Sequence, residues 1–309
     1  MRVCYWGSGN FSKMVLEGIL ELGGGKSVEL VVTKSDKEKG RGKNISQTPV
    51  KELALSVGID VCDREDIRSQ DFVDYIAPKN FDLFIVCDYG KIIPRSVFSL
   101  PRLGSLGVHP SLLPKYRGPS PIHASILNGD EKTGTTLFVI NEEMDAGDIV
   151  LQKEIVISDD DYISLSRKLA HLSAQCVVEF MASPHSFTPH PQDYMQATFT
   201  KMITKEDGRI NWSDSAIDIV RKVRAYIIWP KAWFTFRNKN VKILKAEVCN
   251  DFKIIGNVGE IVKIDGNGIY VLTGSGVIIL KELHPENSNV MGARDFVNGY
   301  RVKVGDTFM

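Results

Sequence analysis

A histidine and an aspartate stand out because each follows a short apolar run at a polar turn. His109 ends the run 106–108 and precedes a proline-containing loop, and Asp145 lies in the acidic turn NEEMDAGD after the β-type run Thr135–Ile140. An imidazole exchanges protons near neutral pH, and a carboxylate within hydrogen-bond reach fixes its tautomer and favours its charged form. Such a pair suits acyl transfer to an amine, in which the attacking nitrogen loses a proton and the leaving nitrogen gains one.

Two strands are needed to position these side chains. We interpret Leu106–Val108 and Thr135–Ile140 as adjacent strands with a helix, Pro121–Asn128, between them. We expect both strands to end at the same edge of a sheet and to present these side chains there. In open α/β sheets, ligands bind at that carboxyl edge. Spacing alone leaves a purely structural role open, since a histidine at a strand end is often only hydrogen-bonded structure and Asp-Ala-Gly is often a turn.

Strands alternate with helices through the first part of the chain. The predicted strands are Arg2–Trp6, Val28–Val32 and Asp82–Cys87, and the predicted helices are Phe11–Leu22, Val50–Val57, Val73–Ala77 and Tyr162–Met181. The turn GSG after the first strand carries only part of the dinucleotide fingerprint, because residue 12 is serine, so a nucleotide cofactor is poorly supported. The alternation predicts an α/β fold with a doubly wound, mostly parallel, Rossmann-like sheet.

The last third of the chain has a different pattern. A helix that Ser213 or Asp214 would cap precedes short β-type runs, namely Val241–Val248, Val258–Ile264, Gly268–Thr273 and Val277–Leu283. Short strands at turn-separated intervals favour a small β-barrel, OB-like in character. The proline-rich stretch Ser183–Gln192 predicts the start of a linker. The expected organisation is a domain at 1–184, a linker at 185–204 and a barrel at 205–309.

Composition limits the class of protein. The 309 residues are 43% hydrophobic and 25% charged, as in globular proteins. No apolar run reaches the about 20 residues that span a bilayer, and the N-terminus lacks a signal-peptide pattern, so we expect a cytoplasmic protein with no membrane partner. Five scattered cysteines predict reduced thiols and no metal site. From residue 201 onward 17 Lys and Arg face 12 Asp and Glu, which fits a bound polyanion and equally fits an ordinary solvated surface.

The segments HPSLLPKYRG and MDAGD together resemble the paired signature of the formyltransferases that use 10-formyltetrahydrofolate. That family has Asn, any residue, His and then SLLP, with an Asp in a later D-x-G turn. His109 and Asp145 match its catalytic positions, and the loop residues that match are Ser111, Leu112, Leu113 and Pro114. The resemblance implies 10-formyltetrahydrofolate as co-substrate, held by this loop and by backbone groups of Lys91, Ile92 and Ile93, without a metal. Ile92 and Ile93 could equally be core residues.

Gly107 is a departure from that pattern, because the family has Asn there. Glycine offers no side-chain donor to the formyl oxygen as negative charge develops on it, and losing one such donor lowers the rate about a hundredfold to a thousandfold. Three explanations are open: a backbone amide, a water or another side chain supplies the donor, the reaction is slower, or activity has been lost. We favour the first, because the rest of the pattern is intact.

A basic stretch follows the second predicted strand. Lys37, Lys39, Arg41 and Lys43 cluster around two glycines, in a loop that resembles the insertion loop of the methionyl-tRNA formyltransferases. The segments TKEDGRINW, WPKAW and MGARDFVNGYRVKVGD resemble the C-terminal domain of the same subgroup. The resemblance implies formylation of initiator methionyl-tRNA for translation initiation, with these four cations contacting the tRNA, and we expect a monomer. The alternatives are a formyltransferase for a sugar nucleotide or another small amine, and a non-catalytic folate- or RNA-binding relative.

Overall fold

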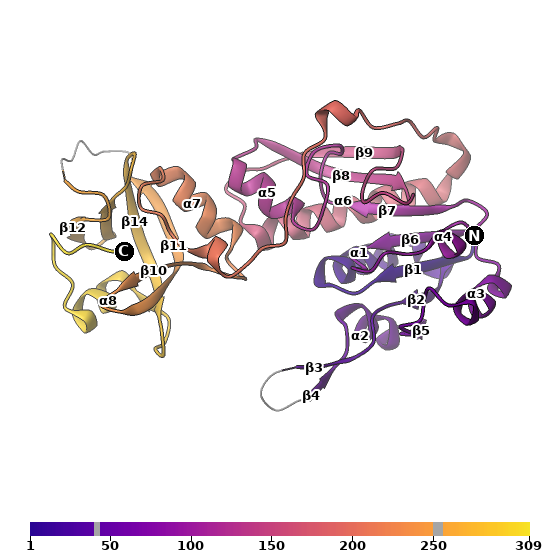
Figure 1. The fold of residues 1–309 in the computed structure, drawn as a ribbon, viewed down its shortest axis with the longest axis horizontal. Helices are drawn as coiled ribbons and strands as arrows, with labels where there is room; N and C mark the ends of the chain where they lie inside the picture. Colours follow the sequence, from indigo (N-terminus) through magenta and orange to yellow (C-terminus); the bar gives the residue numbers. More distant parts are fainter. Residues whose placement is uncertain (40–43, 250–255) are drawn as a thin grey trace. The chain divides into compact units, whose positions relative to one another are not determined.

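The computed structural model describes residues 1–39, 44–249 and 256–309 (Figure 1). The chain divides into two compact units. The first unit comprises residues 1–121, 132–156 and 166–200, and the second comprises 122–131, 157–165 and 201–309.

A seven-stranded sheet forms the centre of the first unit. Its strands, in spatial order, are β5 (Asp60–Cys62), β2 (Val28–Val32), β1 (Val3–Gly7), β6 (Leu83–Cys87), β7 (Ser105–His109), β8 (Lys132–Val139) and β9 (Ile149–Val156). The pairs from β5 to β7 are parallel, whereas β8 and β9 are antiparallel to their neighbours. This topology confirms the predicted α/β, mostly parallel, Rossmann-like sheet.

Helices cover both faces of this sheet. The helices of this unit are α1 (Asn10–Glu21), α2 (Pro49–Ser56), α3 (Gln70–Ile76), α4 (Arg95–Phe98) and most of α6 (Tyr162–Ala182), whereas α5 (Pro121–Asn128) falls almost entirely in the second unit. Every residue of β1 is buried, as expected of a strand packed on both sides. The Tyr5 hydroxyl donates to the Ser12 carbonyl of α1 at 2.7 Å, while the next residue, Trp6, points the other way and packs against Phe72 of α3.

The basic stretch forms part of a hairpin. Strands β3 (Lys37–Lys39) and β4 (Asn44–Ser46) pair antiparallel, with Lys37 opposite Ser46. The sequence predicts only a loop here, so these strands were missed. Lys37 and Lys39 lie on β3, whereas Arg41 and Lys43 lie outside the described residues.

The second unit contains a six-stranded antiparallel sheet. Its strands are β10 (Ala232–Phe236), β11 (Lys239–Cys249), β12 (Ile261–Asp265), β13 (Gly268–Leu272), β14 (Val277–Pro285) and β15 (Met291–Gly292), and its own helices are α7 (Ala216–Ala225) and α8 (Ala293–Tyr300). Single 3-10 turns occur in the first unit at Gly24–Ser27, Ala77–Lys79, Pro184–Ser186 and Tyr194–Gln196, and in the second unit at Glu206–Gly208. The arrangement is consistent with the predicted small barrel-like domain.

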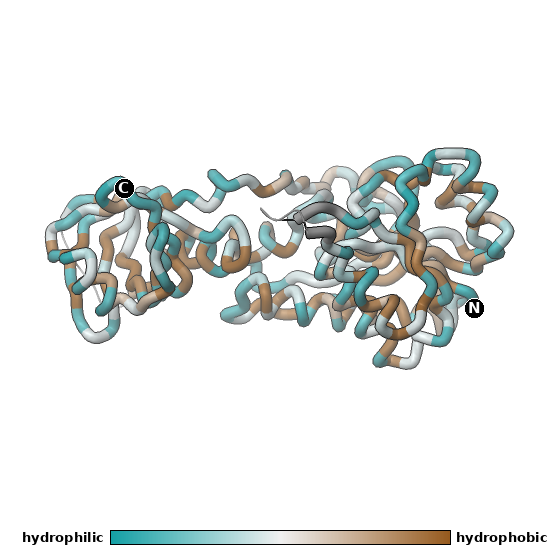
Figure 2. The backbone as a smooth tube through the Cα atoms, turned by 90° about the horizontal axis from the view of Figure 1, so that it is seen from below, coloured by the Kyte–Doolittle hydropathy of each residue, from teal (hydrophilic) through white to brown (hydrophobic). Residues whose placement is uncertain are grey.

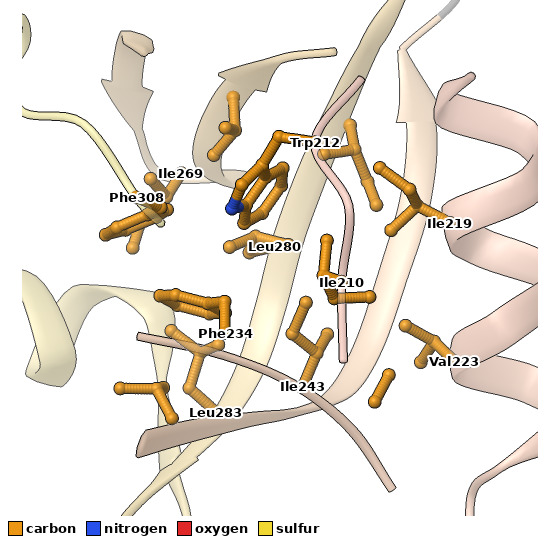
Figure 3. Packing of buried hydrophobic residues seen from close by; sticks show 14 of the residues in the cluster. Ile210, Trp212, Ile219, Val223, Phe234, Ile243, Ile269, Leu280, Leu283 and Phe308 are labelled. Carbon is orange, nitrogen blue, oxygen red and sulfur yellow. The ribbon is translucent and has the colours of Figure 1, made fainter. Parts of the chain in front are cut away.

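An aromatic cluster fills the core of the second unit (Figure 3). The rings of Phe234 and Phe308 lie 4.4 Å apart between centroids, and Trp212 packs against both. Ile219 and Val223 of α7 point into the same core, because positions four apart lie on one face of a helix. Burial of this face is what fixes α7 on the sheet.

The cap of α7 differs from the prediction. Ser215, rather than Ser213 or Asp214, is its N-cap, and the Ser215 side chain accepts a hydrogen bond from the Asp218 amide at 3.2 Å. Asp214 instead accepts from the Asn211 side chain at 2.9 Å in the preceding turn. The prediction was wrong because three adjacent polar residues offer the same local signal, and the turn decides which one faces the helix.

No helix among the described residues is both long and apolar enough to cross a membrane. The longest, α6, has 21 residues and interleaves charged with apolar side chains. Figure 2 shows hydrophobic and hydrophilic residues alternating along the helices. Such a pattern is typical of a helix with one buried face.

Candidate functional site

His109 lies at the end of β7 and is only 6% exposed. Its Nε2 atom is 2.9 Å from the Tyr116 carbonyl oxygen. A carbonyl can only accept, so Nε2 carries the hydrogen, and in the neutral ring Nδ1 is left with a free lone pair. The imidazole is therefore oriented with a proton acceptor available at Nδ1.

Asp145 faces that nitrogen. Its Oδ2 atom lies 3.7 Å from His109 Nδ1 and accepts a hydrogen bond from the Gly118 amide at 2.8 Å. The separation from Nδ1 exceeds a hydrogen bond but lies within ion-pair range. A proton taken up at Nδ1 would create an imidazolium next to a carboxylate, which stabilises the charged ring. The structure thus brings together the two titratable side chains that the sequence singles out.

The route by which Asp145 reaches this position differs from the prediction. Strand β8 runs antiparallel to β7, with Thr136 opposite His109 and Val139 opposite Leu106. The carboxyl end of β8 is therefore at the other end of β7 from His109, and the expectation that both strands end at one edge was wrong. Residues 140–148 turn back toward His109, which lies about 10 Å further along β7 at 3.3 Å per residue.

Gly147 permits this return. A Cβ atom at residue 147 would lie 1.7 Å from the Val139 carbonyl oxygen, so the returning chain runs directly against the end of β8. The Val139 amide donates to the Asp148 carbonyl at 2.8 Å and closes the loop. The glycine of the D-x-G turn is thus required by close backbone approach.

The loop after His109 is held by its own polar groups. The buried Ser111 hydroxyl donates to the Lys115 carbonyl at 2.7 Å, and the Leu113 amide donates to Thr136 Oγ1 at 3.2 Å. Leu113 is also buried, and Leu112 and Pro114 are partly exposed. Of the four predicted folate contacts, Ser111 and Leu113 hold the loop, and the roles of Leu112 and Pro114 toward a folate stay predictions.

The predicted pterin loop separates into core and surface positions. Ile93 is buried and packs in the core around Trp6, whereas Ile92 is 66% exposed and Lys91 is partly buried. Arg95, just after this loop, pairs with Glu142 of the loop that carries Asp145, with 3.2 Å between Nη1 and Oε1. Met144 of that second loop is also 66% exposed. The two loops therefore each carry one exposed apolar side chain, Ile92 and Met144.

The volume next to Gly107 is filled. Gly107 lies opposite Phe138 of β8, and a Cβ atom at residue 107 would lie 2.3 Å from two carbons of the phenyl ring. Phe138 is buried against Leu113 and Ile149. An asparagine at residue 107 would require the ring to move, so the glycine and the phenylalanine are matched in volume.

Comparison with known proteins accounts for both units. A model described as "Formyl transferase" matches residues 1–181, and one described as "Formyl transferase, C-terminal domain" matches residues 202–301. The chain belongs to the formyl transferase family. Relatives of this formyl transferase include the "Methionyl-tRNA formyltransferase" of Sulfurihydrogenibium sp., 39% identical over 100% of both chains, and that of Caldicellulosiruptor saccharolyticus, 36% identical over 99% of both.

Two solved structures share the fold. The sugar 3N-formyl transferase WlaRD is 20% identical with a TM-score of 0.65, over 94% of this chain and 99% of that one. HypX from Aquifex aeolicus in complex with tetrahydrofolic acid is 20% identical with a TM-score of 0.63, over 100% of this chain and 50% of that one. At this identity the likeness concerns the fold alone.

Sequence reasoning missed Asp88 in this formyl transferase. Asp88 follows β6, is open to solvent, and lies against Gly9, where a Cβ atom would be 1.8 Å from its Oδ2. Surrounding protein atoms disfavour its charge and raise the pKa of this carboxyl to about 6, opposed by the nearby Lys34 ammonium. No sequence signal links residue 9 to residue 88. The stretch 190–200 was also missed, because the prolines of residues 183–192 indicate a linker.

Among residues 1–39, 44–249 and 256–309, no group of three or more His, Cys, Asp or Glu side chains is placed to hold a metal ion.

Proposed function

We propose that this chain transfers the formyl group of 10-formyltetrahydrofolate to the α-amine of initiator methionyl-tRNA, as a cytoplasmic monomer. The observation that carries the proposal is the His109–Asp145 arrangement, with Nδ1 available and the carboxylate 3.7 Å away. It is supported by relatives named methionyl-tRNA formyltransferase that match along the full chain in both units. Formyl transfer from this folate is the chemistry of the family.

The site residues manage the proton. Bound 10-formyltetrahydrofolate supplies an electrophilic formyl carbon. His109 takes the proton of the attacking amine on Nδ1, while its Nε2–H continues to donate to the Tyr116 carbonyl and prevents the ring from turning. Asp145 stabilises the imidazolium until the proton passes to the leaving nitrogen. General acid–base catalysis of this kind contributes about 10²–10⁴-fold in rate.

The tRNA contacts are proposed from charge and position in the sequence. Lys37 and Lys39 lie on β3, and Arg41 and Lys43 follow in the same basic stretch. Cations spaced along one segment suit a phosphate backbone, where each neutralised phosphate releases counterions. We propose that this hairpin contacts the tRNA.

Single-turnover formylation of methionyl-tRNA by purified protein with 10-formyltetrahydrofolate tests the proposal. We expect transfer by the parent and a loss of about 10²–10⁴-fold in His109→Ala and in Asp145→Ala. His171→Ala is the matched control, because His171 is exposed on α6 and its ring Nε2 hydrogen-bonds to Gln175 of the same helix. Thermal melting establishes that each variant is folded.

Two outcomes would contradict the proposal. A parent protein that binds the folate but leaves methionyl-tRNA unformylated is not this enzyme, and sugar amines would be tried as acceptors. Retention of the full rate in folded His109→Ala would exclude the proposed proton transfer while leaving the substrate assignment in place.

A further inference from the structure

The stretch between α6 and the second unit is attached to the catalytic sheet. We call residues 190–200 the strap. At one end His190 exchanges two backbone hydrogen bonds with Ile149, at 2.8 and 3.0 Å. At the other end the Arg117 amide donates to the Thr198 carbonyl at 2.9 Å, and the Thr200 amide donates to the Arg117 carbonyl at 2.8 Å. The strap therefore pairs with residues 116–118 in the manner of a short strand.

Residues 116–118 are the segment that holds both members of the site pair. Tyr116 supplies the carbonyl for His109 Nε2, and Gly118 supplies the amide for Asp145 Oδ2. The strap fixes this segment from behind, since the Tyr116 amide donates to Thr198 Oγ1 at 2.8 Å. The orientation of both side chains thus depends on where the strap lies.

Gln192 of the strap makes the most direct connection. Its Nε2 donates to the Asp145 carbonyl at 2.9 Å and to the Gly147 carbonyl at 2.7 Å. Its Oε1 accepts from Arg117 Nη2 at 2.7 Å and from Arg117 Nε at 3.1 Å. An amide has two N–H donors and one oxygen with two lone pairs, so all of its hydrogen-bonding capacity is used. Because carbonyls need donors and the guanidinium needs an acceptor, only one orientation of the amide fits.

Arg117 completes the connection. It is 2% exposed, and its guanidinium carbon lies 4.7 Å from the ring centre of Tyr194 and 6.0 Å from that of Phe199, both in the strap. Tyr194 also hydrogen-bonds to Glu143, in the loop that carries Asp145. A buried cation is retained only where hydrogen bonds and aromatic faces replace its water. The charge on Arg117 therefore holds the strap and, through Gln192, the Asp145 loop in one register.

We propose that Gln192 is a positioning residue for formyl transfer, acting through the backbone of Asp145 and Gly147 to keep the Asp145 carboxylate facing His109 Nδ1. This inference rests on the proposed function of the site pair. Asp145 has a positive φ of 53°, a conformation that its surroundings must hold in place. Two hydrogen bonds to the carbonyls of residues 145 and 147 do this from outside the loop.

The test compares Gln192→Glu with Gln196→Ala in the full-length protein. Glutamate keeps the size and the acceptor for Arg117 but loses both donors to the carbonyls of Asp145 and Gly147. We expect kcat for methionyl-tRNA to fall about 10- to 100-fold with little change in KM, because a displacement of about 1 Å at a reacting group costs up to about a hundredfold. Gln196 is exposed and bonds to Asp193, so Gln196→Ala should match the parent.

A second readout distinguishes positioning from stability. The ring ¹⁵N chemical shifts of His109 and the pH profile of kcat should change in Gln192→Glu and stay unchanged in Gln196→Ala. If folded Gln192→Glu keeps the parent kcat, pH profile and shifts, the inference is overturned. If Gln192→Glu does not fold, Gln192→Asn, which keeps the amide on a shorter stem, is measured in the same way and decides by the same criteria. A parent that does not formylate methionyl-tRNA defeats the proposed function, while the ¹⁵N shifts still decide the positioning role.

Discussion

Gly107 and Phe138 compete for one volume, and this leads to a quantitative prediction. A Cβ atom at residue 107 would lie 2.3 Å from two ring carbons, against 3.4–4 Å for an ordinary contact. Inserting atoms into a packed core costs about 1–3 kcal/mol. The backbone φ of Gly107 is not positive, so a side chain there brings no backbone strain. Replacing a glycine in a strand stabilises the folded state by about 0.5–1 kcal/mol. We expect Gly107→Asn to lower the free energy of unfolding by about 0.5–2 kcal/mol.

The assay is a double-mutant cycle in urea with Phe138→Leu. Leucine shortens the side chain facing residue 107, so the penalty of Gly107→Asn should shrink and the two changes should be coupled by about 1 kcal/mol. Gly266→Asn is the control, because nothing lies within 4 Å of a Cβ at residue 266. We expect that variant to stay within about 0.5 kcal/mol of the parent.

Additive effects in this cycle would refute the reasoning, since they would mean that the side chain at residue 107 does not meet the ring. A rate measurement gives an independent check. Phe138 lies on β8 two residues from Thr136, which is opposite His109. A shift of β8 that makes room for an asparagine at residue 107 should therefore also disturb His109 and slow formyl transfer in Gly107→Asn. In the double variant Gly107→Asn/Phe138→Leu the rate of formyl transfer should return toward that of the parent. A faster Gly107→Asn single variant would show instead that the ring yields and the amide acts as the missing donor.

Three further predictions concern other parts of the chain. The pKa of Asp88 is raised to about 6, so its negative charge destabilises the folded state above pH 6 and has no such effect below pH 4, where the carboxyl is protonated. Because the side chain is exposed, we expect Asp88→Asn to raise the free energy of unfolding by no more than about 1 kcal/mol at pH 8. At pH 4 urea titrations should give the same stability for the variant and the parent. Phe234→Ala should cost about 3–5 kcal/mol in thermal or urea unfolding, because the ring is fully buried among aromatic partners, and a loss under 1 kcal/mol would contradict that packing. Replacing Lys37 and Lys39 with alanine should weaken tRNA binding and reduce the slope of log K against log salt concentration by about 1–2. Filter binding between about 50 and 200 mM salt measures this slope, because phosphate contacts respond to salt over that range. An unchanged slope would argue against phosphate contacts by these two lysines.

The sequence predicts well those features that depend on local pattern. The limits of β2, and the placing of His109 at the end of β7, follow from apolar runs bounded by turn residues. The resemblance to formyltransferases selected the site pair, and the structure places those two side chains face to face. Their roles stay predictions until the variants are measured.

Features that depend on distant contacts were not predictable. The antiparallel direction of β8 is decided by its pairing with β7 and β9, and period-two alternation is the same in either direction. Gln192 joins Asp145 across 47 residues, through a side-chain amide and a main-chain carbonyl, and neither group has a sequence signature. Proline content predicts that a linker begins at residues 183–192, but it says nothing of what their polar side chains bond to.

The strap also bears on how this protein family can be taken apart and recombined. The two family models leave residues 182–201 unassigned, and the strap lies inside that interval. A hybrid in which the second domain of one relative replaces that of another would inherit a mismatched strap if the junction were placed at residue 182, and Tyr116 and Arg117 would lose their partners in the strap. A junction after Thr200, where the first compact unit ends, keeps them. For exchange between relatives, the working boundary of the catalytic half therefore lies about 20 residues beyond the end of α6.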